Sequence, residues 1–220
     1  MIRFKTFGSV DLSDPDAGAT FSVLGHPKRI ALLTYLATAS PQGFQRRDTL
    51  LAMFWPELDT ERARHALNQA LYALRQDLGE AVVVSRGQEE VGIDEGALWC
   101  DVVAFRQAVE AGSWQEALDV YRGEFLEGFH LSGSSVFEEW LEGARRRLRD
   151  QAAEAAWSVA ETEAKAGRRT EAAKAARRAA GYAWDDEIAI RRLLVFLDEL
   201  GDRAGAVAAY TAFAERLRED

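Results

Sequence analysis

The chain has 220 residues, 48% of them hydrophobic and 29% charged, with a single cysteine and a formal net charge of −9. This composition excludes a disordered protein and a disulfide-stabilised secreted domain, and no apolar run reaches the roughly 18 residues that span a membrane. We therefore expect a globular cytoplasmic protein, and the length predicts two domains rather than one.

The negative charge argues against a nucleic-acid-binding protein, because affinity for phosphates comes from Lys and Arg. The charges are unevenly distributed along the chain, however. Between Lys28 and Arg75 there are seven basic and four acidic residues, which gives this stretch a net charge of +3. A local basic patch can bind DNA while the rest of the molecule stays acidic, so the objection is weakened but not removed.

The N-terminal part of the chain predicts a small sheet followed by helices. Alternating apolar and polar residues over 2–12 indicate strands, and residues 21–24 are expected to return as a short strand. The apolar period becomes helical after Pro27, and residues 47–54 form a second short helix that Pro56 ends.

A third helix is predicted from Thr60 to Leu78, with Asp59 as its cap and Gly79 as its stop. At about 100° per residue, it separates an apolar stripe from a polar face. The apolar stripe consists of Ala63, Leu67, Ala70, Leu71, Leu74 and Leu78. The polar face carries Arg, His, Asn and Gln, the side chains that hydrogen-bond base edges and phosphates. Taken alone, an ordinary solvated face explains this helix better than DNA recognition does.

Two β-rich runs around a glycine-bearing turn, residues 81–85 and 91–93, predict a hairpin directly after the third helix. The order of sheet, three helices and hairpin is that of a winged helix, in which the third helix enters the major groove of DNA. This context favours DNA recognition over a solvated face for the third helix.

Beyond Trp99 the sequence predicts helices only, including a long one from Val136 to Lys165. An internal repeat is visible, because Gly167 and Gly201 lie 34 residues apart in matching contexts, and 34 residues is the tetratricopeptide period. Stacked helix pairs need a turn glycine and small residues where the helices cross. The second half is therefore predicted to be an all-α, tetratricopeptide-like repeat domain.

Several short motifs occur in an order that is typical of one family. They are Leu50–Trp55 with Pro56, Ala63–Gly79, Asp101–Val102 with Phe105, Glu116–Gly123, Phe125–Phe129, Glu139–Leu141 and Arg145–Leu148. In these motifs the chain resembles the bacterial transcriptional activator family typified by the antibiotic regulatory proteins (SARP, AfsR-like). Members of that family join an OmpR-type winged helix to a bacterial transcriptional activator domain built from tetratricopeptide-like repeats.

The resemblance implies a mainly α fold with a small β component. It places a winged-helix DNA-binding domain at 1–96 and an activator domain at 97–220. The family pattern usually continues past Asp220, so the activator domain is expected to be truncated and the chain to be a piece of a larger regulator.

The resemblance also implies which residues contact DNA. The third helix would read the major groove, the hairpin would follow the neighbouring backbone or minor groove, and the start of the second helix would hold a phosphate. The candidate DNA-binding residues are Arg46, Arg47, Arg64, His65, Asn68, Gln69, Tyr72, Arg75 and Arg86. The loop at 55–59, between the second and third helices, is a candidate contact for RNA polymerase.

We expect a DNA-binding transcriptional activator whose partners are double-stranded DNA, RNA polymerase and, through the repeat domain, a second copy or another protein. The alternative is a protein-interaction module whose winged helix no longer binds DNA, because Glu89 and Glu90 on the hairpin would repel phosphates. The sequence contains no clustered catalytic residues, and His26, His65 and His130 lack metal-ligand spacing, so neither an enzymatic activity nor a cofactor is expected.

Overall fold

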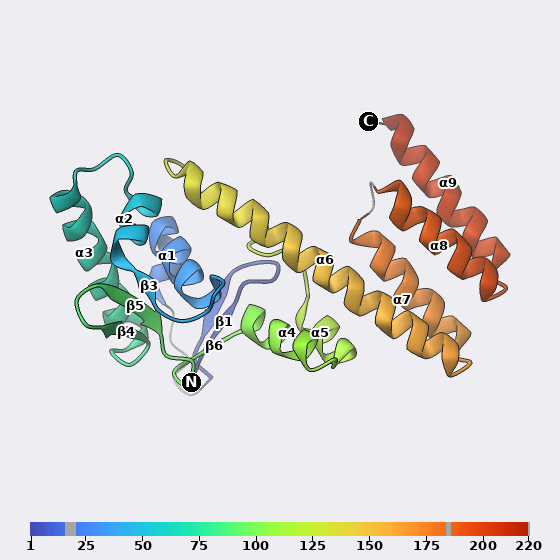
Figure 1. Cartoon of the computed structure of the whole chain (residues 1–220), viewed down its shortest axis with the longest axis horizontal. Coiled ribbons are helices and arrows are strands. Elements are labelled where there is room, and N and C mark those ends of the chain that lie inside the picture. Colours follow the sequence, from blue (N-terminus) through green and yellow to red (C-terminus); the bar gives the residue numbers. More distant parts are fainter. Residues whose placement is uncertain (16–20, 184–185, 220) are drawn as a thin grey trace. The chain divides into compact units, whose positions relative to one another are not determined.

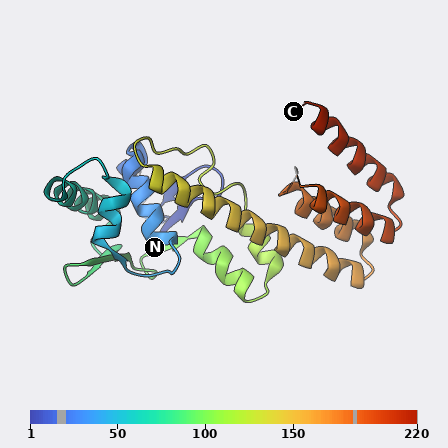
Figure 2. The ribbon, with the colours of Figure 1, turned by 45° about the horizontal axis from the view of Figure 1, so that its top comes forward.

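A computed structural model describes residues 1–15, 21–183 and 186–219, and the chain divides into two compact units (Figure 1, Figure 2). The first unit comprises Met1–Arg106 with Val120–Arg145, and the second comprises Gln107–Asp119 with Arg146–Asp220. Within the described part of the chain, no helix has the length and apolar character needed to cross a lipid bilayer.

The N-terminal elements are β1 (Ile2–Lys5), β2 (Asp11–Ser13), the 3-10 helix η1 (Ser22–Gly25), α1 (Pro27–Thr38), β3 (Gln45–Arg46), α2 (Arg47–Phe54), α3 (Thr60–Leu78), β4 (Val83–Arg86), β5 (Glu90–Ile93) and β6 (Leu98–Cys100). They are followed by α4 (Asp101–Glu110), α5 (Trp114–Val120), the long α6 (Ser135–Lys165), α7 (Arg169–Gly181), α8 (Glu187–Glu199) and α9 (Arg203–Glu219). The fold is therefore mainly helical, with a winged helix-turn-helix region ahead of a helical repeat region, as predicted.

Strand β1 is the centre of a three-stranded sheet with the order β2-β1-β6. It pairs antiparallel with β2, where Phe4 lies opposite Leu12, and parallel with β6, where Phe4 lies opposite Cys100. The Phe4 side chain is completely buried. The sheet is therefore complete only after the chain has passed through all three helices and the hairpin.

The strand predicted at 21–24 is wrong, because Ser22–Gly25 forms a 3-10 helix. The Asp77 carboxylate on α3 accepts hydrogen bonds from the backbone N–H groups of Ser22 (3.1 Å) and Val23 (2.6 Å). A carboxylate that satisfies two successive N–H groups fixes the start of a helical turn, which a short apolar run cannot reveal by its periodicity.

Helix α3 has the capping and the buried face that its sequence predicts. The Asp59 side chain accepts a hydrogen bond from the N–H of Arg62 (2.9 Å), and Gly79 ends the helix with a φ of +96°, in a region that favours glycine. All six residues of the predicted apolar stripe are buried. The opposite face is thereby left to solvent, which makes its polar side chains available to a partner.

The predicted hairpin is formed by β4 and β5, which pair from Val83 opposite Ile93 to Arg86 opposite Glu90. Strand β3 adds a third strand to this sheet, with Arg46 opposite Glu90. The sequence does not predict β3, because it is only two polar residues long. It nevertheless ties the start of α2 to the hairpin, which is called the wing below.

The segment between α5 and α6 is held against the residues that directly follow β1. The N–H of Leu126 donates to the carbonyl oxygen of Thr6 (2.7 Å), and the N–H of Gly8 donates to the carbonyl oxygen of Glu124 (2.9 Å). A side chain at Gly123 would place its Cβ 2.9 Å from the backbone of Gly8, so only glycine permits this close approach. These contacts explain why residues 120–145 belong to the same unit as the winged helix.

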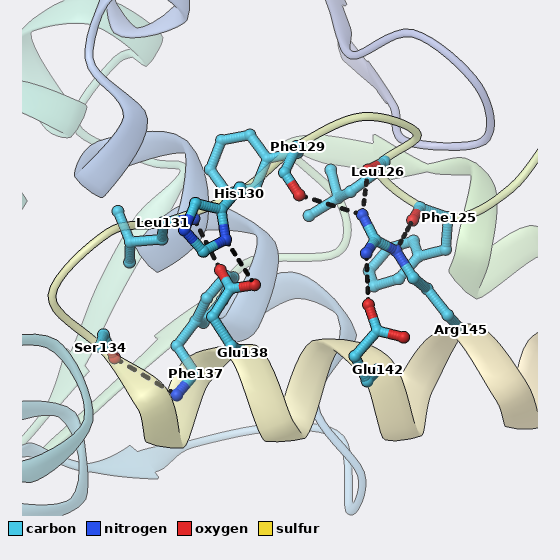
Figure 3. Close-up of polar contacts among 10 residues, drawn as sticks. All are labelled: Phe125, Leu126, Phe129, His130, Leu131, Ser134, Phe137, Glu138, Glu142 and Arg145. Carbon is cyan, nitrogen blue, oxygen red and sulfur yellow. Dashed lines mark hydrogen bonds and ion pairs between the residues drawn. The ribbon is translucent and has the colours of Figure 1, made fainter.

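Arg145 of α6 holds the other side of this segment (Figure 3). Its guanidinium donates hydrogen bonds to the carbonyl oxygens of Phe125 (2.9 Å), Leu126 (2.5 Å) and Phe129 (3.1 Å), and it pairs with Glu142 (2.5 Å). The arginine side chain is only 11% exposed. Its guanidinium therefore binds three backbone carbonyls of the loop, and the carbonyl of Leu126 also accepts from the N–H of Phe129 (3.0 Å).

The start of α6 is fixed by two further side chains (Figure 3). Ser134 accepts a hydrogen bond from the N–H of Phe137 (3.3 Å) as an N-cap, and its hydroxyl donates to the carbonyl oxygen of Met53 at the end of α2. The Glu138 carboxylate accepts the N–H of Leu131 (2.6 Å) and pairs with His130 (2.9 Å). The end of α2 and the beginning of α6 are thus directly joined.

The second unit is built from helix pairs, and α7, α8 and α9 follow one another side by side (Figure 1). The turns at Gly167 and Gly201 have nearly the same positive φ, +75° and +79°, as expected for equivalent positions of a repeat. The core between these helices is rich in alanine from α6 and α7, and it includes Leu193 and Leu197 of α8. Small residues allow the helix backbones to approach closely.

Candidate nucleic-acid interface

The polar face of α3 carries five of the nine predicted residues in exposed positions. These are Arg64, His65, Asn68, Gln69 and Tyr72. Gln69 and His65 lie one helical turn apart and hydrogen-bond through their Nε2 atoms (3.0 Å), and Tyr72 is 64% exposed. The face therefore presents hydrogen-bonding groups over two helical turns, which is the length of helix that can follow a major groove.

Arg46 and Arg47 lie where β3 passes into α2, but their environments differ. Arg46 is exposed and lies 3.8 Å from the Asp48 carboxylate. Arg47 is half-buried between α3 and the wing, where its N–H donates to the carbonyl oxygen of Glu89 (2.8 Å) and its Nη1 donates to Oδ1 of Asn68 (2.9 Å). Arg46 thus lies on the surface beside Asp48, whereas Arg47 is held beside the polar face of α3.

Burial lowers the pKa of the Arg47 guanidinium, and the nearby charge of Arg75 lowers it further, while Glu89 acts in the opposite direction. The Nε of Arg47 is buried and has no hydrogen-bond partner among the residues that the structure describes. This guanidinium therefore has more hydrogen-bonding capacity than the protein uses.

A polar cavity of about 380 Å³ lies between the start of α2, the polar face of α3 and the turn of the wing. Its lining residues are Arg47, Asp48, Arg64, Leu67, Asn68, Gly87, Gln88 and Glu89. Two arginines and two amides against two carboxylates make this hollow suitable for a polar, electron-rich ligand edge rather than for an apolar molecule.

Arg75 and Arg86 are engaged within the protein. Arg75 donates from Nε to the carbonyl oxygen of Val83 (2.9 Å) and from Nη2 to the hydroxyl of Ser85 (3.1 Å), so it fastens strand β4 to α3. Arg86 lies over the ring of Phe44, with its guanidinium carbon 4.7 Å from the ring centroid. These two arginines shape the wing, in addition to any contact that they make with DNA.

The acidic residues of the wing have distinct partners. Glu90 pairs with Arg86 (2.5 Å), and this hydrogen bond holds the pKa of the Glu90 carboxyl below its usual range and raises that of Arg86. Glu89 instead lines the cavity beside Arg47. Sequence reasoning did not identify Phe44, Gln88 or the Arg86–Glu90 pair, because Phe44 precedes β3 in a loop and nothing in the spacing marks it.

The structure thus brings Arg47, Arg64 and Asn68 together around one cavity. His65 and Gln69 are hydrogen-bonded to each other. Arg75 and Arg86 instead stabilise the wing. In residues 1–15, 21–183 and 186–219, no three His, Cys, Asp or Glu side chains are grouped so that they could hold a metal ion.

A comparison with protein families matches residues 100–220 to the bacterial transcriptional activator domain. The chain belongs to this family. The resemblance inferred from its motifs is therefore confirmed. No curated protein matched the sequence.

Among solved structures, this bacterial transcriptional activator domain protein is similar to Mycobacterium tuberculosis EmbR in complex with a low-affinity phosphopeptide. The TM-score is 0.64 at 20% sequence identity, and the similarity covers 100% of this chain and 60% of the EmbR chain. The likeness shows a shared fold that includes the winged-helix region.

The family match begins at Cys100, within β6, so it includes residues that complete the winged-helix unit. One of them is Asp101, whose buried carboxylate accepts hydrogen bonds from Thr6 N (2.7 Å), Thr6 Oγ1 (2.7 Å), Phe7 N (2.9 Å) and Val102 N (2.8 Å). In this member of the family, an acidic residue at the start of α4 thus fixes the end of β1.

Proposed function

We propose that the protein is a DNA-binding transcriptional activator, with a winged-helix domain at 1–96 that binds promoter DNA and an activator domain at 97–220. The observation that carries this proposal is the exposed polar face of α3 beside the cavity formed with the wing. Family membership supports a role in transcription. The net charge of +3 over residues 28–75 supplies the local attraction to phosphates.

Fluorescence anisotropy with labelled duplexes tests the proposal. The wild type should bind, and its affinity should fall steeply between about 50 and 200 mM salt, because each phosphate contact releases counterions. Arg64→Ala should weaken binding several-fold. Arg191→Ala is the matched control, since Arg191 is an exposed arginine on α8, where it pairs with Glu187. Absence of salt-sensitive binding, or equal affinities of the two variants, would refute the proposal.

The alternative function is a protein-interaction module without DNA affinity. The net charge of −9 and the position of Glu89 at the rim of the cavity favour it. It predicts that no duplex binds even at low salt, while affinity purification of the intact chain recovers a reproducible protein partner. Tight duplex binding would exclude it.

We further propose that the repeat region mediates self-association, with another protein as the alternative partner. Ala173 and Ala176 of α7 are buried in the core shared with α8. Their equivalents 34 residues later in α9 are Val207 and Tyr210, which are 66% and 59% exposed. Two large side chains of α9 are thus exposed at positions whose equivalents in α7 are buried.

The exposed face of α9 is suited to a second copy. Val207, Tyr210, Ala214 and Leu217 follow the alternating spacing of three and four residues that forms a coiled-coil seam. In an antiparallel pair centred on residue 212, Tyr210 lies opposite the partner's Ala214 and Val207 opposite the partner's Leu217. In this arrangement the tyrosine ring packs on a small side chain, and two aliphatic side chains pack on each other.

Sedimentation equilibrium tests this association. Tyr210→Glu should shift the protein toward the monomer at concentrations where the wild type is dimeric. Ala204→Glu places the same charge on an exposed residue in the first turn of α9, outside this seam, and should leave the mass unchanged. A monomeric wild type at high concentration would rule out self-association and favour another protein as the partner.

The loop at 55–59 is proposed as the polymerase contact. Trp55 is buried beneath Lys28, which also pairs with Glu57 (3.6 Å), so the loop is held in a defined shape while Pro56 and Glu57 remain exposed. Glu57→Ala should reduce activated transcription in a reconstituted system without changing the affinity for promoter DNA. Unchanged transcription would refute this assignment.

A further inference from the structure

The side chain of Asn68 is oriented by an arginine from another helix. Arg47 donates from Nη1 to the carbonyl oxygen Oδ1 of Asn68 across 2.9 Å. The backbone of Arg47 is itself fixed, because its N–H donates to the carbonyl oxygen of Glu89 in the wing. The amide of Asn68 is therefore held from a rigid point at the start of α2, although Asn68 is exposed on α3.

This bond determines which hydrogen-bonding groups the pair presents outward. Oδ1 of Asn68 accepts from a charged donor, which takes one of its two lone pairs and leaves a positive charge beside the other, and Nδ2 retains two N–H groups. The guanidinium of Arg47 has further N–H groups and no acceptor. The two side chains together thus form a row of donors at the cavity, which both of them line.

The base edges in the major groove differ in how well they match such a row. Guanine presents two acceptors, N7 and O6, whereas adenine presents the acceptor N7 and the donor N6. An unrestrained asparagine pairs with adenine, because its oxygen accepts from N6 while its nitrogen donates to N7. With the Arg47 cation beside that oxygen, a guanine edge matches the remaining donors, whereas adenine N6 would have to donate to an oxygen that already accepts from a positively charged group.

We propose that Arg47 is a positioning residue that turns Asn68 into a donor-only reader, so that α3 selects guanine at the base pair reached by Asn68. The inference rests on the proposed DNA binding and specifies the sequence preference of the same site. The acidic residues Asp48 and Glu89 line the same cavity. Their negative charges attract the Arg47 guanidinium and oppose its movement toward the DNA phosphates, so they help to keep it beside Asn68.

Selection of duplexes from a randomised library, followed by sequencing, tests the inference with the intact chain. The wild type should enrich guanine at one position. Asn68→Asp keeps the oxygen that Arg47 binds but replaces both N–H donors with an acceptor, so that position should change to cytosine, whose N4 donates. Arg47→Ala frees Oδ1 and should reduce the preference for guanine over adenine by about 10-fold, within the range of one bidentate pair.

Gln76→Glu is the matched control, because it makes the same amide-to-carboxylate change on an exposed residue near the end of α3. The side chain of Gln76 donates a hydrogen bond to the Glu80 carboxylate (3.3 Å). It should weaken all sequences alike and change no preference. Circular dichroism and melting curves check that every variant is folded.

Three outcomes would overturn the inference. A wild type that binds DNA but enriches adenine at the position sensitive to Asn68 would refute the donor-only readout alone. Enrichment of guanine at that position by the Asn68→Asp variant would also refute the donor-only readout. A wild type that binds no duplex at low salt would refute the proposed function itself, and the inference with it.

Discussion

Arg145 is expected to be a main determinant of stability in the first unit. Arg145→Ala removes three hydrogen bonds to backbone carbonyls and the ion pair with Glu142. Hydrogen bonds to charged groups contribute about 1.5–3 kcal/mol each, and water can replace part of them at the loop surface. We therefore expect a loss of about 3–5 kcal/mol, which comes mainly from the three hydrogen bonds to carbonyls, since the Glu142 side chain is exposed.

Arg145→Lys should lose less, about 2 kcal/mol, because one ammonium keeps the charge but cannot reach three carbonyls in a fork. Arg146→Ala is the control, since Arg146 is its exposed neighbour on α6, and its effect should stay within about 0.5 kcal/mol.

Urea unfolding followed by tryptophan fluorescence measures the loss, because the ring of Trp140 lies 6.2 Å from that of Phe125 in the segment that Arg145 holds. Since the chain has two compact units, the transition should be assigned by hydrogen exchange, with the amide of Leu126 as the local probe. A loss below about 1 kcal/mol, or one equal to that of Arg146→Ala, would show that the reasoning about the carbonyls is wrong.

Three further predictions concern other parts of the winged-helix unit. Asp101→Asn should lower the free energy of unfolding by about 2–4 kcal/mol in urea titrations, because the new amide turns donors toward the N–H groups of Thr6 and Phe7; stability equal to the wild type would contradict this. Burial raises the pKa of the Cys100 thiol to about 12, so a disulfide reagent should label it at pH 8 only in urea, and rapid labelling of the folded protein would be contrary evidence. Arg75→Ala should loosen the wing and weaken binding to all duplexes alike, as measured by anisotropy, whereas a change in preference at a single base would instead indicate direct readout.

The sequence predicts the architecture well where periodicity and caps act locally. The stripe from Ala63 to Leu78 and the turns at Gly167 and Gly201 are examples, because a helical face and a left-handed turn are encoded within a few residues. Strand β6 is not predicted, because three residues after a turn carry no period.

The predictions for the site divide in the same way. That Asn68 and Gln69 are exposed follows from the helical period alone. That Arg75 holds Val83 and Arg47 holds Asn68 does not, since these pairs depend on how α2, α3 and the wing meet in space. Residue types that can bind DNA can also bind the protein's own backbone, and only the folded arrangement distinguishes the two uses.

The pairing of β1 with β6 also bears on how such regulators can be recombined. A gene fusion that cut the chain after residue 96 would remove β6, the Asp101 carboxylate and the segment held by Arg145, and would leave Phe4 and Phe7 without their cover. The winged-helix region is therefore not an independent cassette that can be exchanged at residue 96. A fusion that keeps this region folded must also include the first part of the activator sequence, up to α6.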